Sequence, residues 1–123
     1  MTNNHQKRIA IICRKPPYGS SLAKEAIDTI LASSVFDQMI TVIFTGEGVW
    51  QLHKEQTPNE INSKNIAKQL TAFELYGIDN IYIDQQALAD RHLAANDLVI
   101  NGKLESPQDL AELIDKHDVI LSF

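Results

Sequence analysis

The sequence predicts an α/β fold in three layers (α/β/α), with a five-stranded, mainly parallel sheet between two layers of helices. Two observations lead to this prediction. Short apolar runs alternate with helical patterns along the whole 123-residue chain, as in parallel sheets whose strands are joined by helices. The first run is rich in isoleucine, which is typical of a strand that is covered on both faces. The pattern leaves the order of the strands open.

Five apolar runs are the candidate strands. Each is short and is bounded by polar residues, glycine or proline, which is the usual punctuation of a strand. The predicted strands cover residues 8–13, 39–45, 81–83, 98–100 and 119–123.

Capping residues place the helices between these strands. Serine or aspartate at a helix start accepts a hydrogen bond from a free backbone N–H, and glycine often follows a helix end. We expect a helix after Ser20 or Ser21, a turn over 49–52, a helix from Ser63 to Gly77, a short helix over 87–91 after Asp84, and a last helix with Ser106 as cap, Pro107 at its first position and Lys116 and His117 in its last turn.

Length and charge limit the kind of protein. We expect one domain over residues 1–123, with residues 1–7 as a flexible N-terminus. The formal net charge is −5, from 11 basic and 16 acidic residues, so the basic footprint of direct nucleic-acid binding is missing. No apolar run approaches the length of a membrane span, and the first is too short for a secretory leader. The expected location is the cytoplasm.

Two loops follow the first two predicted strands, and both contain unusual residues. In an open parallel sheet, the loops at the carboxyl ends of the strands share one edge, which we call the working edge. Here these loops are 14–19 and 46–52. Their basic and aromatic side chains predict a partner-binding surface of Arg14, Lys15, Tyr18 and Trp50. The sequence leaves open whether Trp50 belongs to the core or to an interface.

The sequence offers little support for a catalytic or metal site. Cys13 is the single cysteine. It is a candidate nucleophile, but it also continues an apolar strand as a small buried residue, and we prefer that interpretation. The four histidines have no metal-binding spacing, and the glycine-rich phosphate loops are missing. We therefore predict no catalytic residue, no metal and no cofactor.

Three segments together resemble a known family. They are the Pro-Tyr-Gly turn within 14–19, the Gly-Val-Trp-Gln-Leu segment at 48–52, and the closing Asp-Val-Ile-Leu-Ser-Phe at 118–123. The chain resembles the DsrE/DsrF/DsrH group of sulfur-relay proteins, and within it the TusC/DsrF branch, from residue 7 to residue 123. The resemblance implies a three-layer α/β/α domain.

The resemblance also implies a function in a complex. Such a chain would be a subunit of a hetero-oligomer, typically a heterohexamer, with TusB/DsrH-like and TusD/DsrE-like subunits. The complex would pass persulfide sulfur to a TusE/DsrC-like acceptor, and finally to 2-thiouridine at the tRNA wobble position. A role in dissimilatory sulfur oxidation is the alternative pathway. The active cysteine of the family lies after the third strand of the TusD/DsrE-like subunit, and this chain has Asp84 there.

The expected function is therefore that of a non-catalytic subunit. Two other interpretations remain open at this point. The chain could be a sulfurtransferase that acts through Cys13, or a free-standing domain that binds a small ligand. The accessibility of the thiol tests the first of these, and complex formation tests the second.

Overall fold

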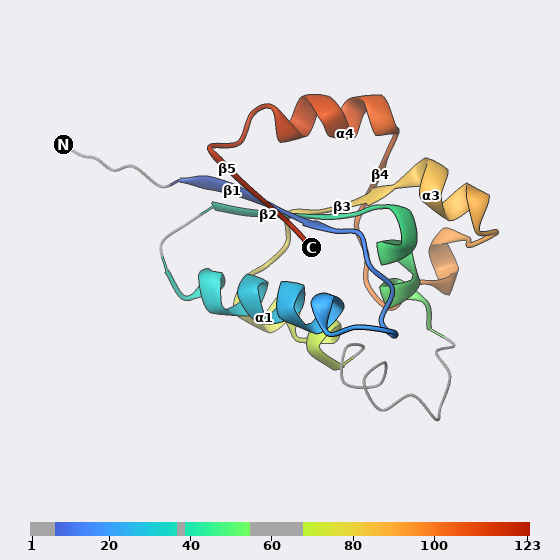
Figure 1. Ribbon diagram of the computed structural model, residues 1–123, viewed down its shortest axis with the longest axis horizontal. Helices are drawn as coiled ribbons and strands as arrows, with labels where there is room; N and C mark the ends of the chain where they lie inside the picture. Colours follow the sequence, from blue (N-terminus) through green and yellow to red (C-terminus); the bar gives the residue numbers. More distant parts are fainter. Residues whose placement is uncertain (1–6, 37–38, 55–67) are drawn as a thin grey trace.

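A single sheet with helices on both faces forms the framework of the molecule (Figure 1). The computed structural model describes residues 7–36, 39–54 and 68–123. The sheet consists of β1 (Arg8–Cys13), β2 (Met39–Phe44), β3 (Ile81–Asp84), β4 (Lys103–Glu105) and β5 (Val119–Ser122). All neighbouring strands are parallel. The three-layer α/β/α architecture with a five-stranded parallel sheet confirms the predicted fold class.

The strand order is β4-β3-β2-β1-β5. The register places Cys13 opposite Phe44, so β1 and β2 end at the same level. The loops that follow these two central strands therefore leave the sheet side by side at its carboxyl edge.

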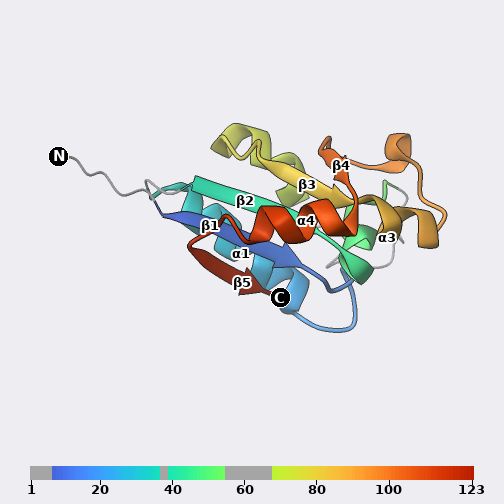
Figure 2. The same cartoon turned by 90° about the horizontal axis from the view of Figure 1, so that it is seen from above.

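Two apolar cores hold the layers together. The larger core lies between the sheet and α1 (Leu22–Ser34), and it contains Ile27 and Ile30 of the helix, both fully buried. The smaller core lies under α4 (Pro107–Ile114), where Leu110 packs with Ile12 and Ile43. Figure 2 shows α4 lying across the sheet on the face opposite α1. Successive side chains of a strand point to opposite faces, so neighbouring residues of β1 and β2 serve different cores.

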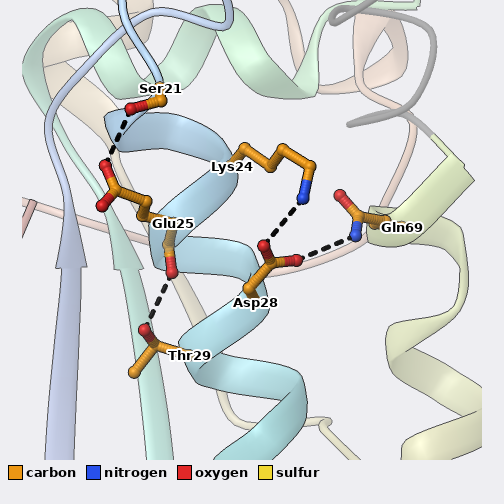
Figure 3. Close-up of polar contacts among 6 residues, drawn as sticks. All are labelled: Ser21, Lys24, Glu25, Asp28, Thr29 and Gln69. Carbon is orange, nitrogen blue, oxygen red and sulfur yellow. Dashed lines mark hydrogen bonds and ion pairs between the residues drawn. The ribbon is translucent and has the colours of Figure 1, made fainter.

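The outer side of α1 is polar and is tied to a second helical segment at 68–71 (Figure 3). Lys24 forms an ion pair with Asp28 one turn later, with 2.8 Å between Nζ and Oδ2. The amide of Gln69 donates to the other carboxylate oxygen of Asp28 at 3.1 Å. The exposed ion pair adds little stability by itself, but Asp28 links two helical segments that cover the same face of the sheet.

Side-chain caps begin α3 (Gln85–Asp90) and α4, as predicted. Asp84 accepts from the backbone N–H groups of Gln86 and Ala87, and Ser106 accepts from that of Asp109. The cap at α1 is different. Ser21 is the capping residue, but its hydroxyl is bonded to the carboxylate of Glu25 and not to the backbone.

The end of α4 differs from the prediction. The helix ends at Ile114, so Lys116 and His117 lie beyond its last turn. The His117 ring lies 2.8 Å from the carbonyl oxygen of Leu113 through Nδ1, and 2.8 Å from the hydroxyl of Thr41 through Nε2. His117 therefore connects the end of α4 to the sheet.

The prediction of the fourth strand was wrong. Residues 98–100 form no sheet strand, and β4 is the polar segment Lys103–Glu105. Leu98 instead forms an isolated antiparallel bridge with His53 and packs into the larger core. The run at 98–100 is apolar because Leu98 is buried against a distant loop, and not because the run forms a strand. The true strand is polar because charged side chains are typical of an exposed sheet edge.

Short 3-10 helices complete the described part of the chain: η1 (Gly46–Leu52), η2 (Phe73–Tyr76) and η3 (Ala95–Asp97). The helical turn expected over 49–52 is part of η1. The helix expected from Ser63 begins outside the described residues, and Gly77 follows η2 in the left-handed conformation, with a φ of 73°. The predicted flexible N-terminus also lies outside the described residues, except for residue 7.

Candidate functional site

The two loops singled out in the sequence lie against each other at the working edge (Figure 1). The N–H of Thr45 donates to the carbonyl of Cys13 at 3.1 Å, and the buried amide of Gln51 donates to the carbonyl of Lys15 at 2.8 Å. A Cβ atom on Gly48 would lie 2.0 Å from the carbonyl oxygen of Cys13. Only glycine, which has no Cβ, permits this close approach of two backbone segments. Gly48 therefore allows η1 to lie directly against the first loop.

The two basic residues of the first loop, Arg14 and Lys15, differ in their exposure. Arg14 is exposed, and its Nε donates to the hydroxyl of Ser122 at 2.8 Å. Its backbone N–H donates to the carbonyl of Phe123 at 2.8 Å. Lys15 is half-buried. The first loop is thereby fastened to β5 on one side and to η1 on the other.

The two aromatic residues of the predicted surface also differ. Tyr18 is 50% exposed at the tip of the first loop. Trp50 is half-buried, whereas its neighbours Val49 and Leu52 are completely buried. The ring of Trp50 meets that of His53 edge to face, with 6.0 Å between centroids. Trp50 is thus neither a full core residue nor a free surface residue.

Cys13 lies in the core at the end of β1. The side chain has no exposed surface, and burial raises the pKa of the Cys13 thiol from 9.0 to about 12. The thiolate is the reactive form of cysteine. At neutral pH the thiol is therefore protonated and out of contact with solvent, which is the environment of a packing residue.

Asp84 occupies the place after the third strand where the resemblance puts a cysteine in another subunit. One oxygen of its carboxylate accepts from the backbone N–H groups of Gln86 and Ala87, at 3.0 and 3.2 Å. The other accepts from the hydroxyl of Thr45 at 2.6 Å. Asp84 is 8% exposed, and its carboxylate links α3 to the loop after β2 through these hydrogen bonds.

One contact at the working edge was missed by sequence reasoning. Arg91 forms an ion pair with Glu47 at 3.0 Å and donates to the carbonyl of Ala87 at 3.0 Å. It joins the end of α3 to η1. The two charged residues are 44 positions apart, so no local pattern could have paired them.

Within the described ranges, no group of three or more histidine, cysteine, aspartate or glutamate side chains comes together in a way that could hold a metal ion. His53 packs on Trp50, His117 bonds to Thr41, and His92 is exposed. The described part of the site therefore consists of a rigid pair of loops with basic and aromatic side chains.

Comparison with known proteins identifies the family of this chain. The DsrE/DsrF-like family matches residues 7–123. The chain belongs to the DsrE/DsrF-like family. The match runs nearly from end to end, and it confirms the resemblance drawn from the three sequence segments.

Relatives within the DsrE/DsrF-like family are similar over most of their length. A protein from Vibrio parahaemolyticus named "Protein TusC homolog" is 38% identical over 116 residues, which are 94% of this chain and 98% of that protein. One of the same name from Pseudomonas aeruginosa is 29% identical over 93% of this chain and 96% of its own length. The TusC/DsrF branch suggested by the sequence is therefore supported by its relatives.

Solved structures show the same fold at low sequence identity. The crystal structure of the YchN protein from E. coli superposes with a TM-score of 0.80 at 18% identity, and covers 96% of this chain and 100% of YchN. A protein of unknown function from Bacteroides thetaiotaomicron superposes with a TM-score of 0.69 at 15% identity, over 95% of each chain. Proteins of much lower sequence identity thus share the three-layer fold of this chain.

None of the helices in the described part of the chain is long and apolar enough to cross a lipid bilayer.

Proposed function

We propose that this chain is a non-catalytic, TusC-like subunit of a sulfur-relay complex that passes persulfide sulfur. One observation supports this above all: the single cysteine of a chain that matches a sulfur-relay family from end to end is completely buried and has a raised pKa. A persulfide carrier needs an accessible thiolate. The sulfur must then travel on cysteines of other subunits, and this chain supplies structure and binding surface.

The proposed partners are TusB/DsrH-like and TusD/DsrE-like subunits, in a heterohexamer located in the cytoplasm. The proposed end point is 2-thiolation of the tRNA wobble uridine, through a TusE/DsrC-like acceptor. The TusC homologues among the relatives favour this pathway. The alternative is a DsrF-like role in dissimilatory sulfur oxidation, which is favoured by the Arg-Lys form of the loop at 14–19.

The working edge is the proposed contact surface for an acidic partner or acceptor. Arg14 and Lys15 supply positive charge on a chain whose net charge is −5. Tyr18 and Trp50 each keep part of their aromatic surface exposed, and aromatic residues and arginine are enriched at interaction hot spots. The loops that carry them are held together by backbone contacts, so the surface is already formed before a partner binds.

Co-expression with the cognate TusB-like and TusD-like subunits tests the proposed assembly. Size-exclusion chromatography should show that all three chains elute together as one stable complex. Interfaces of about 2,000 Å² or more are expected for such a complex. If this chain stays apart from both partners, the proposed function is wrong.

Variants of the working edge test the contact surface. Arg14→Ala/Lys15→Ala should slow association most at low salt, because charge acts mainly on encounter rate. Trp50→Ala should speed dissociation at every salt concentration. Binding kinetics across ionic strength, with the acceptor and with the partner subunits, distinguish the two effects. Wild-type kinetics for both variants would remove the working edge from the proposal, and unfolding of Trp50→Ala would show that Trp50 is structural.

A further inference from the structure

Two hollows lie next to each other at the amino edge of the sheet, opposite the working edge. The larger has a volume of about 610 Å³ and the smaller about 370 Å³. Both are lined by Gly77, Ile78 and Asp79, which connect η2 to β3. The smaller one extends to Met39 at the start of β2, and the larger one to Ile100 before β4. The two hollows therefore adjoin each other along this connecting segment, and we call them together the amino-edge groove.

Large apolar side chains stand exposed around this groove. Leu75 is 89% exposed and Tyr76 50% exposed on η2, and Met39 is 49% exposed at the start of β2. Val35 and Phe36, at the end of α1 next to the groove residue Ser34, are 70% and 65% exposed. Figure 1 shows the end of α1 and the starts of β1 and β2 at the same end of the molecule. Such a concentration of exposed apolar side chains marks an interaction surface.

The charge of the groove indicates what kind of partner would fit. Glu74 and Asp79 line the larger hollow and are exposed, and its lining contains no lysine or arginine. Within the described part of the chain, neither carboxylate forms a salt bridge. A partner that fits would therefore present apolar side chains together with lysine or arginine.

A second copy of this chain fits the groove poorly. A symmetric dimer buries the same patch of both subunits, so it would enclose Glu74 and Asp79 of both copies in one interface, and the lining of the two hollows offers no lysine or arginine to pair with them. Like charges that are brought together at an interface oppose association, and each copy also has a net charge of −5. The partner is then a different protein.

We propose that the amino-edge groove binds another subunit of the relay complex, one that presents apolar side chains flanked by basic residues. This inference rests on the proposed function for its assumption that such a complex exists. It assigns different partners to the two opposite ends of the sheet. The amino-edge groove, with Glu74 and Asp79, binds a basic subunit, and the working edge, with Arg14 and Lys15, stays free for an acidic partner or acceptor.

Substitutions of exposed apolar residues test the groove. Leu75→Ser and the double variant Phe36→Ser/Leu75→Ser should lower the affinity for the cognate TusB-like and TusD-like subunits by about tenfold or more, mainly through faster dissociation. Ile120→Ser is the matched control, because Ile120 is 48% exposed on β5, away from the groove. It should keep wild-type affinity. Leu75 is almost fully exposed, so its replacement should leave the melting temperature unchanged.

Charge reversal tests the chemistry of the partner. Glu74→Lys/Asp79→Lys should slow association by about tenfold at low salt and by less at high salt. Glu112→Lys/Asp115→Lys makes the same change in net charge, at exposed positions on and just after α4, and should have a much smaller effect.

The outcomes separate the two proposals. If the wild-type chain fails to assemble with its cognate partners, both proposals are wrong. If it assembles and the Leu75 and charge-reversal variants bind like their controls, only the groove proposal is wrong. If the wild-type chain alone forms a dimer that Leu75→Ser dissociates, a second copy covers the groove, and the groove proposal is again wrong.

Discussion

At the scale of single residues, the contact between Cys13 and Gly48 links the packing of the site to its chemistry. The thiol is fully buried at the end of β1, and the backbone of Gly48 lies against the carbonyl of the same residue. Burial disfavours the charged form of a thiol. The position of Cys13 in the fold thus predicts a thiol of low reactivity, and the contact leads to two predictions.

The first prediction concerns pH. The pKa of Cys13 rises from 9.0 to about 12 on folding, so above pH 9 the unfolded chain loses a proton that the folded chain keeps. Stability from this group is fully present below pH 9 and is lost as the pH rises toward 12, at about 1.4 kcal/mol per pH unit. Cys13→Ala removes this dependence, at a packing cost of about 1 kcal/mol near neutral pH.

Urea denaturation of the wild type and of Cys13→Ala across this pH range provides the measurement. The wild type should be more stable than Cys13→Ala near neutral pH, and the difference should reach zero about one pH unit above 9.0 and then reverse as the pH rises toward 12. Alkylation of Cys13 should be slow in the native protein and fast in denaturant. Parallel pH curves for the two proteins would contradict the assigned burial.

The second prediction concerns Gly48. An added Cβ would lie 2.0 Å from a backbone oxygen that cannot move aside, so Gly48→Ala should destabilise the fold by about 3 kcal/mol. Gly19→Ala is the control. Gly19 has a φ of 87° but no atom within 4 Å of an added Cβ, so only the left-handed conformation costs energy, about 1 kcal/mol. Chemical denaturation compares the two, and equal losses would contradict the close packing of the loops.

The sequence predicted which edge of the sheet carries the residues of the candidate site. The location of Arg14, Lys15, Tyr18 and Trp50 at one edge follows from the rule that strand-end loops of a parallel sheet meet. The degree of burial of Trp50 could not be predicted, because it depends on how η1 turns under the first loop. The Gly48 contact fixes that turn, and no local pattern reveals a contact between backbones.

At the scale of elements, the end of α3 has a histidine at the left-handed position where glycine is usually found. His92 has a φ of 56°. The N–H of Leu93 donates to the carbonyl of Leu88, and that of His92 to the carbonyl of Ala89, which is the Schellman pattern of a helix end. Glycine is favoured at this left-handed position because it has no Cβ.

The third prediction follows from this geometry. His92→Gly should stabilise the protein by about 0.5 kcal/mol, since relief of the left-handed strain outweighs the added entropy of the unfolded chain. Gly77→Ala makes the reverse change at the left-handed residue after η2, and should destabilise by about 1 kcal/mol. Thermal melting measures both. A loss of stability in His92→Gly would show that the His92 side chain makes a contact that matters.

The elements themselves were predictable where local chemistry defines them. Asp84 and Ser106 cap their helices as expected, because a cap depends only on residues within one turn. The fourth strand was not predictable, because its pairing partner lies in β3 and its residues are polar. The apolar run at 98–100 was mistaken for a strand, although Leu98 is buried by contact with a distant loop.

At the scale of the whole molecule, the two ends of the sheet carry surfaces of opposite character. The working edge carries Arg14 and Lys15 beside partly exposed aromatic residues, and the amino-edge groove carries Glu74 and Asp79 beside exposed apolar side chains such as that of Leu75. Between them the single thiol is enclosed in the core. This distribution supports the proposed role of a subunit that connects other proteins and leaves the sulfur chemistry to them.

A sulfur-labelling experiment tests the central claim most directly. The complex reconstituted from this chain and its TusB-like and TusD-like partners is loaded with radioactive sulfur from a cysteine desulfurase, and the subunits are separated under non-reducing conditions. We predict label on a partner subunit, none on this chain, and the same transfer rate when Cys13→Ala replaces the wild type. Label on Cys13 that is passed on to the acceptor, or loss of transfer in Cys13→Ala with assembly intact, would contradict the account.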